Sequence, residues 1–370
     1  MTLEGRVRVA ARFDGERIES VSVRSDRPLA ANALLAGRTG EEALALLPGV
    51  FAVCGHSQAT VSAAAIDAAA DTAPPQAVQR RRERELVAET ASEHAFRLLL
   101  DWPRLAGVEE DVTLLARVRS LLARAPESEA SWGAARDALI GMVQSRILGA
   151  GLDTWLEQFS ASEWLEWARS GRTATARTLA ALCPATEWAA PDTAFLTDLG
   201  RARLAGKIAL PALGQPGFEA RPELDGGTAE CGPLARNHLH PALRDLARRD
   251  RIVARAFARL AEFAQILREE NCAGRIDQVA LGPGRGAATG EMARGLLTHA
   301  VELDAGRVRR YAIVAPTEWN FHPAGPLYRE LEGRPARDAG AARRALEIAA
   351  ATLDPCVELQ CELEGEPSHA

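Results

Sequence analysis

Apolar and polar residues alternate over the first part of the chain, which predicts an extended hairpin. From Val7 to Phe13 every second residue is apolar, Asp14-Gly15 supplies a turn, and an extended run resumes from Ile18 to Val23. Alternation with a period of two across an Asp-Gly turn is typical of a β-hairpin. Near the other end of the chain, two extended runs flank Asp304-Ala305-Gly306 and predict a second hairpin over residues 296–314.

Most of the remaining chain repeats its apolar residues at helical spacing. The predicted helices cover residues 41–47, 57–70, 76–102, a succession from 107 to 222, a long helix with apolar positions from 243 to 267, and 339–352. Large aromatic residues in the central succession are predicted to anchor its core: Trp132, Trp155, Trp164, Trp167 and Trp188. The pattern as a whole predicts an α+β protein that is mostly helical.

A glycine-rich stretch, Gly282-Pro283-Gly284-Arg285-Gly286, is predicted to be a loop. It lacks the Gly-Lys-Ser/Thr ending of a phosphate-binding loop, and it does not open a helix after a strand. We therefore exclude a nucleotide site there. Residues 215–227, which are also rich in Gly and Pro, are predicted to form another loop.

Length and charge narrow the class of protein. With 370 residues, 47% of them hydrophobic, the chain can bury a substantial core. A formal net charge of −6, without a basic face interleaved with aromatic residues, argues against nucleic acid as a partner. The chain has no run of about eighteen apolar residues, and its first residues lack the pattern of a secretory signal. We expect a cytoplasmic protein without a membrane partner, which binds another protein or a small ligand.

Six cysteines in a chain of this length indicate reduced thiols rather than a disulfide framework. Cys54 stands at the amino terminus of the predicted helix at 57–70, and Cys356 and Cys361 stand a few residues before the carboxyl terminus. A helix start favours the thiolate over the thiol, so Cys54 is predicted to bind metal better than the other cysteines. Thiolates from both ends of a chain suit a soft metal fragment held between the two termini.

Six short motifs follow one another in a particular order. They are Leu3-Glu4-Gly5, Val53-Cys54-Gly55, Gly232-Pro233-Leu234-Ala235-Arg236, Glu291-Met292-Ala293-Arg294-Gly295-Leu296-Leu297, Pro316-Thr317-Glu318-Trp319-Asn320 and Asp354-Pro355-Cys356. In this order they resemble the large subunit of nickel-iron hydrogenases across nearly the whole chain. The resemblance implies a large-subunit-like α+β fold with small antiparallel sheets and converging termini. It implies one domain over 1–370, with a divergent helical region at 106–227 and the C-terminal motifs in 228–370.

Two of the four metal-binding cysteines of that family are absent. Ser57 stands where the second amino-terminal cysteine belongs, Leu359 where the second carboxyl-terminal one belongs, and Val61 replaces a histidine. Nickel with four thiolate ligands cannot form at such a site, so we expect no nickel and no hydrogen activation. The combination resembles the HupK/HoxV group of hydrogenase accessory proteins, to which a role in maturation of the large subunit is ascribed.

The resemblance to this group implies a non-catalytic scaffold that assembles or carries an iron fragment, Fe(CN)2(CO), for the large subunit. Cys54 and Cys356 are the predicted iron thiolates, because low-spin iron(II) with strong-field ligands suits soft sulfur. Arg294 and Thr317 match positions that approach the cyanides in the family and donate hydrogen bonds to them. The cysteines that bridge to iron in the family are the two that are lost. Either the fragment is shifted toward Cys54 and Cys356, or Cys361 serves as a substitute ligand.

Further expectations follow from the same resemblance. Glu4 matches the proton-relay carboxylate of the family and, without nickel, either keeps a role or only hydrogen-bonds locally. The expected partners are a maturation chaperone and an iron-sulfur assembly protein (HypC/HypD-like) and the precursor of the hydrogenase large subunit. Two alternatives remain at this point: a divergent hydrogenase-like redox subunit, and a metal-free interaction protein with the same fold.

Overall fold

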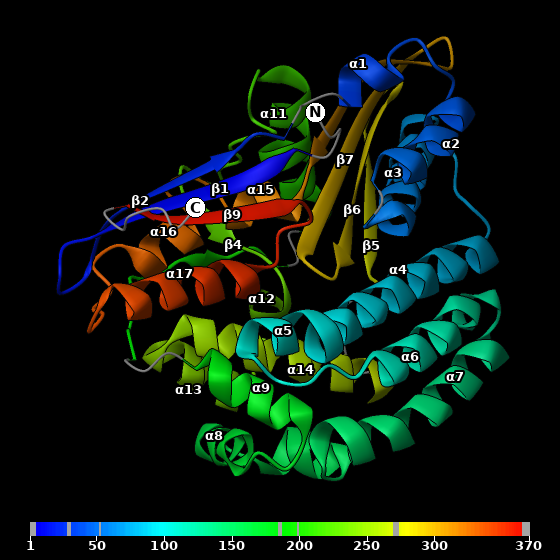
Figure 1. Cartoon of the computed structure of the whole chain (residues 1–370). Helices are drawn as coiled ribbons and strands as arrows, with labels where there is room; N and C mark the ends of the chain where they lie inside the picture. The colour runs from blue at the N-terminus through cyan, green and yellow to red at the C-terminus, as the bar shows by residue number, and fades with distance from the viewer. Residues whose placement is uncertain are drawn as a thin grey trace.

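The computed structural model describes residues 5–27, 31–51, 53–183, 187–197, 200–268 and 274–364. Its first and last strands lie side by side, β1 (Arg6–Phe13, blue in Figure 1) and β9 (Glu358–Glu364, red). β1 forms the predicted hairpin with β2 (Ile18–Ser25), and β9 completes a sheet of order β2-β1-β9. The predicted convergence of the chain ends is confirmed. The pairing of β9 with β1 is parallel, so this sheet is mixed rather than antiparallel.

A second, antiparallel sheet contains four consecutive strands. They are β5 (Ile276–Gly282), β6 (Arg285–Met292), β7 (Gly295–Asp304) and β8 (Arg307–Val314). The hairpin predicted over 296–314 is confirmed as β7 and β8. The loop predicted at 282–286 is wrong, because only Pro283-Gly284 form a turn and the flanking residues belong to β5 and β6.

Close packing of helix α3 (Gly55–Ala69) explains the small residues of β6. A Cβ atom on Gly286 would lie 2.3 Å from the backbone nitrogen of Ala69, and one on Gly290 would lie 2.4 Å from Val61 Cγ2. Glycine is needed where backbone approaches this closely. Helices α2 (Gly40–Val50) and α3 cover one face of the sheet (Figure 1). The helix that follows Cys54 is therefore fixed against the sheet.

The helical half of the molecule is built around stacked aromatic rings. Trp164 stacks on Trp155 with ring centroids 4.7 Å apart and on Phe257 at 5.6 Å. The indole of Trp164 also donates a hydrogen bond of 2.9 Å to the Trp155 carbonyl, so its polar atom is satisfied inside the core. We call the tryptophan cluster the set Trp155, Trp164, Trp167, His240 and Phe257.

Two predictions for the helical region need correction. Trp132 is buried with the cluster tryptophans, but Trp188 is only half-buried, because it lies in the irregular segment at 187–193. The long helix predicted from its apolar positions at 243–267 is two helices, α13 (Pro241–Arg249) and α14 (Arg251–Arg268). Asp250 separates them with extended dihedral angles, and its carboxylate accepts a hydrogen bond of 2.9 Å from the Ile252 N–H.

Helix α17 (Ala339–Leu353) confirms the last predicted helix and determines where Cys356 lies. It ends at Asp354, which has a left-handed φ of 57° and donates its N–H to the Ala350 carbonyl. Pro355 cannot continue a helix, so the chain turns away toward β9. Cys356 occupies this short connection.

The other elements complete the framework. The remaining helices are α1 (Ala31–Leu35), α4 (Gln76–Phe96), η1 (Arg97–Asp101), α5 (Trp102–Ala106), α6 (Val112–Arg124), η2 (Ala125–Glu127), α7 (Glu129–Met142), η3 (Val143–Leu148), η4 (Thr154–Gln158), α8 (Ala161–Ser170), α9 (Ala174–Leu182), α10 (Gly200–Arg203), η5 (Leu204–Ala209), α11 (Leu210–Gly214), α12 (Pro233–Arg236), α15 (Pro316–Asn320) and α16 (Pro326–Leu331). The short strands β3 (Ala194–Phe195) and β4 (Ala229–Glu230) pair in parallel.

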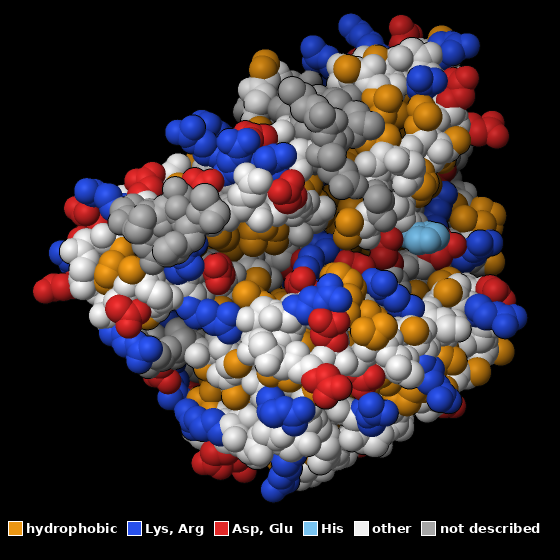
Figure 2. Space-filling model, in the orientation of Figure 1, with side chains coloured by type: hydrophobic (Ala, Val, Ile, Leu, Met, Phe, Trp, Pro, Cys, Tyr) orange, Lys and Arg blue, Asp and Glu red, His pale blue; other side chains and the backbone are white. Residues whose placement is uncertain are grey.

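One face of the molecule is hollowed. Figure 2 shows this hollow between the sheet-bearing half and the helical half, with basic and acidic side chains lying in it. Among the described helices, none combines the length and the hydrophobicity needed to cross a bilayer.

Candidate metal centre

Cys54 and Cys356, the two predicted thiolates, come together from distant parts of the sequence. Cys54 precedes α3 and is 4% exposed, and Cys356 follows α17. After burial, the charge of Cys356 is the largest cause of the raised pKa of Cys54. The charges of both cysteines also raise the pKa values of Arg294 and Arg27. Because charges act on one another mainly within about 10 Å, the two side chains lie in the same region of the molecule.

Cys54 lies at a helix start, as predicted, but its pKa moves in the opposite direction. Burial, followed by the charges of Cys356 and Glu89, raises the pKa of Cys54 to about 12. The charge of Arg294 and a 3.6 Å hydrogen bond from Gln58 Nε2 to Cys54 Sγ act against this rise. The expectation of a free thiolate is wrong, since desolvation outweighs the helix start. A metal that binds Cys54 has to displace its proton.

Thr317 holds Cys356 in place from helix α15. Its Oγ1 atom lies 3.2 Å from Cys356 Sγ and accepts a hydrogen bond of 3.4 Å from the Cys356 N–H. Because the hydroxyl oxygen accepts from the backbone, its own proton is free to point at the sulfur. The structure thus brings Thr317 to the metal centre, where it contacts the sulfur directly.

Arg294 enters the site from the turn between β6 and β7. Its Nη2 atom contacts Glu93 Oε2 at 3.0 Å and Asp354 Oδ1 at 3.3 Å. Its Nε and Nη1 atoms are buried and have no hydrogen-bond partner among the described residues. Burial alone would lower the pKa of Arg294, but the charges of Asp354, Glu93, Cys356 and Cys54 raise it. The guanidinium is therefore held on one side and offers unused donors in a site that it shares with both sulfur atoms.

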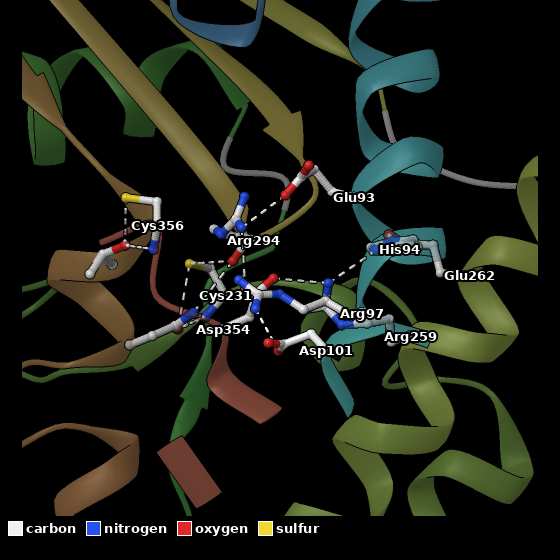
Figure 3. Close-up of polar contacts among 12 residues, drawn as sticks. Glu93, His94, Arg97, Asp101, Cys231, Arg259, Glu262, Arg294, Asp354 and Cys356 are labelled. Atoms are coloured by element: carbon white, nitrogen blue, oxygen red, sulfur yellow. Dashed lines mark hydrogen bonds and ion pairs between the residues drawn. The ribbon is translucent and has the colours of Figure 1, made fainter. Parts of the chain in front are cut away.

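Asp354 connects this guanidinium to two others (Figure 3). Arg97 Nη2 lies 2.6 Å from its Oδ1 atom, and Arg259 Nη1 lies 3.0 Å from its Oδ2 atom. Burial would raise the pKa of Asp354, but the three arginines, with Arg294 first, lower it. The left-handed backbone of Asp354, which costs about 1 kcal/mol, is held by these ion pairs. We call the charged junction the set Glu93, His94, Arg97, Arg259, Glu262, Arg294 and Asp354.

A second guanidinium lies at the site and was missed from the sequence. Arg27 stands two residues after the first hairpin, its side chain is 12% exposed, and its Nη1 atom lies 3.3 Å from Glu318 Oε1. Burial would lower the pKa of Arg27, but the charges of Cys356, Glu318 and Cys54 raise it. Arg27 lies outside the quoted motifs, and nothing in the local sequence sets it apart from a surface arginine.

Ser57, which stands at the position of a lost cysteine, is hydrogen-bonded to Glu89. Glu89 of α4 accepts hydrogen bonds from the Ser57 hydroxyl, from the Ser57 N–H at 3.0 Å and from the His56 N–H at 3.1 Å. Glu89 thereby satisfies the free amides at the start of α3. His56 itself is exposed, and Val61 is buried against the sheet.

Cys361 lies outside this group. It pairs with Val9 in the register of β1 and β9, and it packs against the hydrophobic cluster that contains β1 and α17, whereas Cys54 belongs to the cluster around α3. Burial, then the charge of Glu347, raises the pKa of Cys361 to about 12. Glu4 falls outside the described residues. Within the described ranges, no three His, Cys, Asp or Glu side chains form a group able to hold a metal ion.

Comparisons with known proteins give the family. Residues 251–358 match the nickel-dependent hydrogenase family. The chain is 32% identical to the hydrogenase expression/formation protein HoxV of Cupriavidus necator, over 94% of this chain and 95% of that protein. It is 30% identical to the hydrogenase expression/formation protein HupK of Azotobacter vinelandii, over 98% of this chain and 99% of that protein. The chain belongs to the HupK/HoxV family of hydrogenase expression/formation proteins.

Solved structures confirm the fold of this HupK/HoxV family member. A Ni-Fe-Se hydrogenase from D. vulgaris Hildenborough matches it with a TM-score of 0.58 at 15% identity, over 93% of this chain and 94% of that chain. The Ni-Fe-Se hydrogenase of Desulfomicrobium baculatum matches with a TM-score of 0.55, also at 15% identity and over the same shares of both chains. The predicted large-subunit-like α+β fold is confirmed by these matches.

The residues present fit an iron fragment with diatomic anionic ligands. The buried thiol of Cys54 and the half-buried thiol of Cys356 supply soft ligands, and the unused Nε and Nη1 donors of Arg294 suit acceptor nitrogen atoms of cyanide. A buried guanidinium with unpaired donors is costly unless a ligand satisfies it. This combination favours a ligand that brings its own acceptors over a bare metal ion.

Proposed function

We propose that this protein is a non-catalytic scaffold of hydrogenase maturation that assembles or carries an Fe(CN)2(CO) fragment. The observation that carries the proposal is that buried Arg294 has unsatisfied Nε and Nη1 donors in a region where the charges of Cys54 and Cys356 act on it. Cys54 and Cys356 bind the iron as thiolates, Arg294 donates to a cyanide nitrogen, and Thr317 positions Cys356. The family to which the chain belongs supports a role in hydrogenase expression or formation.

The same site suits holding and release better than turnover. Loading requires that Cys54 lose a proton whose pKa is raised to about 12, so part of the binding free energy is spent on deprotonation. Two protein ligands also hold iron less tightly than four. Ser57 is bound to Glu89, which leaves it unsuited to replace a thiolate for nickel. We therefore propose iron without nickel as the cargo.

The proposed partners follow from this role. The fragment comes from a maturation chaperone and an iron-sulfur assembly protein (HypC/HypD-like), and it passes to the precursor of the nickel-iron hydrogenase large subunit. The hollow in Figure 2 is the face on which we propose that these partners dock in turn.

An infrared spectrum of the protein, purified without oxygen from cells that contain the maturation machinery, tests the proposal. We expect carbonyl and cyanide stretching bands, with iron and without nickel, and loss of both bands and iron in Cys54→Ala and Cys356→Ala. Cys361→Ala is the matched control, because Cys361 lies in β9 outside the site, and it should keep the bands. Nickel in the purified protein would favour a redox subunit, and a protein without iron or bands would be a metal-free interaction protein.

A further inference from the structure

Arg27 interacts electrostatically with both thiols, and neither the motifs nor the proposed function uses it. It stands two residues after the end of β2, whereas Arg294 lies in the turn between β6 and β7. A Cβ atom on Gly5 would lie 2.7 Å from Arg27 Cα, so backbone packs tightly against this residue. The backbone of Arg27 is therefore held in place by its packing against Gly5.

The guanidinium of Arg27 is tied to the same helical turn that holds Cys356. Its partner Glu318 follows Thr317 in α15, and Thr317 Oγ1 contacts Cys356 Sγ at 3.2 Å. Glu318 also lies 3.5 Å from the Ser25 hydroxyl. These contacts place Arg27 near Cys356, and the charges of Cys356 and Cys54 raise the pKa of Arg27 as they do that of Arg294.

We propose that Arg27 is a second cyanide-facing guanidinium, which together with Arg294 makes the two-thiol site selective for iron that already carries anionic ligands over bare divalent metal ions. This inference rests on the proposed function and adds to it the choice of cargo. Arg27 is a specificity-determining residue in this scheme, because it touches the cargo without binding the metal.

The charges of the alternative cargoes explain the selection. Iron(II) with two cyanides, one carbon monoxide and two thiolates carries a net charge of −2, whereas a bare divalent ion with two thiolates and waters is neutral. Cyanide nitrogen atoms accept charge-assisted hydrogen bonds from guanidinium groups, and water ligands do not replace them as anionic acceptors. Glu318, Glu93, Asp354 and Glu89 offset part of the positive charge with either cargo. The difference in affinity between the two cargoes then depends on the guanidiniums of Arg27 and Arg294. Unlike the four carboxylates, they carry N–H donors for cyanide.

The test compares two substitutions at Arg27 with a matched control. Arg27→Met removes the charge and the donors at similar length, and Arg27→Lys keeps the charge but loses the fork of donors. Arg82→Met is the control, because Arg82 has a similarly buried side chain, 17% exposed, in an ion pair of 2.6 Å with Asp67 on α3. Each variant is purified from cells with the maturation machinery, and thermal unfolding confirms that it folds.

Iron per chain, the cyanide bands and zinc binding by the metal-free protein give three independent readouts. For Arg27→Met we expect about tenfold lower iron occupancy, shifted cyanide bands in the remainder, and zinc affinity that is unchanged or higher. Arg27→Lys should recover part of the occupancy, and Arg82→Met should resemble the wild type in all three. A general loss of structure at the site would lower zinc and iron binding together, which distinguishes it from lost selectivity.

The outcomes separate this inference from the proposed function. Wild-type bands that persist with unchanged position and intensity in both Arg27 variants would overturn the role of Arg27 and leave the scaffold intact. Equal losses of zinc and iron in both variants would also overturn it, since Arg27 would then be structural. A wild-type protein without bands would reject the scaffold and the role of Arg27 with it.

Discussion

The tryptophan cluster and the charged junction both lie in the interior, but they bury opposite kinds of side chain. Trp155, Trp164 and their neighbours fill the helical half with stacked rings, and the indole N–H groups of Trp164 and Trp167 donate to backbone carbonyls. The charged junction places three arginines, two of them fully buried, around Asp354, and two nitrogen atoms of Arg294 have no hydrogen-bond partner among the described residues. Aromatic burial stabilises a fold wherever it occurs, whereas burial of ions costs free energy that only partners recover.

This difference locates function in the junction. A core that served stability alone would replace such ions with apolar residues of similar volume, often without loss. Arg294 belongs to both the junction and the metal centre, since it pairs with Asp354 and the charges of Cys54 and Cys356 act on it. We infer that the junction orients Arg294, while the tryptophan cluster contributes stability that offsets the free-energy cost of burying these ions.

The largest expected effect comes from breaking the centre of the junction. Asp354→Asn keeps the shape of the side chain but removes the charge that three guanidiniums share, and we expect a loss of about 5 kcal/mol in the free energy of unfolding. Urea unfolding measures this loss. Asp101→Asn is the control, because Asp101 pairs with Arg97 at 2.6 Å with its side chain 39% exposed, and it should cost less than about 1 kcal/mol. Similar small losses for both variants would mean that the charge of Asp354 contributes little to the stability of the junction.

The corresponding change in the helical half should separate stability from the site. Trp164→Ala removes a fully buried ring from the tryptophan cluster, and we expect a loss of about 4 kcal/mol in the free energy of unfolding. Iron per folded chain should stay at the wild-type value. Trp188→Ala, at a half-buried position, should cost about 1 kcal/mol or less. Loss of iron from the folded fraction of Trp164→Ala would show that the two regions are coupled.

The sequence was sufficient where local pattern determines structure. Alternation predicted the hairpin of β1 and β2, and helical spacing predicted α3 and α17, which place Cys54 and Cys356. The strand β6 was not predicted, because Gly286 and Gly290 are typical of a loop when read alone. Their small size serves the close approach of α3, which depends on tertiary packing.

The site was predictable as far as motifs reach. Thr317 contacts Cys356, and the charges of Cys54 and Cys356 act on Arg294, but the high pKa of Cys54 depends on burial that the sequence does not contain. Arg27 and Glu89 act through contacts with distant elements, so no local signal distinguishes them from surface residues. The place of Cys361 depends on the parallel register of β9 with β1, which spacing from Cys356 does not determine.

A smaller effect should appear as a dependence of stability on pH. Burial lowers the pKa of His94 to about 4, and neutral His94 donates from Nε2 to Glu262 at 2.8 Å and accepts at Nδ1 from Arg259 at 3.1 Å. The pKa of His94 in the unfolded chain is 6.5. As the pH falls below this value, the unfolded chain binds a proton at His94, whereas the folded chain binds it only near pH 4. The free energy of unfolding should therefore fall over this window by up to about 1.4 kcal/mol per pH unit from this residue.

His94→Gln tests this origin of the pH dependence. The substitution removes the titrating group. The slope of the free energy of unfolding against pH should therefore decrease by up to about 1.4 kcal/mol per pH unit, the equivalent of one proton, between pH 6.5 and 4. His299 in the four-stranded sheet, whose pKa burial lowers to about 3, remains in the variant and keeps its own contribution. An unchanged slope would mean that His94 is already protonated in the folded junction.

The smallest expected effect sharpens the boundary between structural and functional groups at the metal centre. Ser57→Ala removes the hydroxyl that donates to Glu89, but the backbone N–H groups of Ser57 and His56 still satisfy the carboxylate. We expect a loss of about 1 kcal/mol in the free energy of unfolding, as for Ser160→Ala at the start of α8. Iron content and infrared bands should be those of the wild type. Iron lost from Ser57→Ala but not from Ser160→Ala would make the Ser57 hydroxyl a ligand, and the site would then hold its cargo with three groups instead of two.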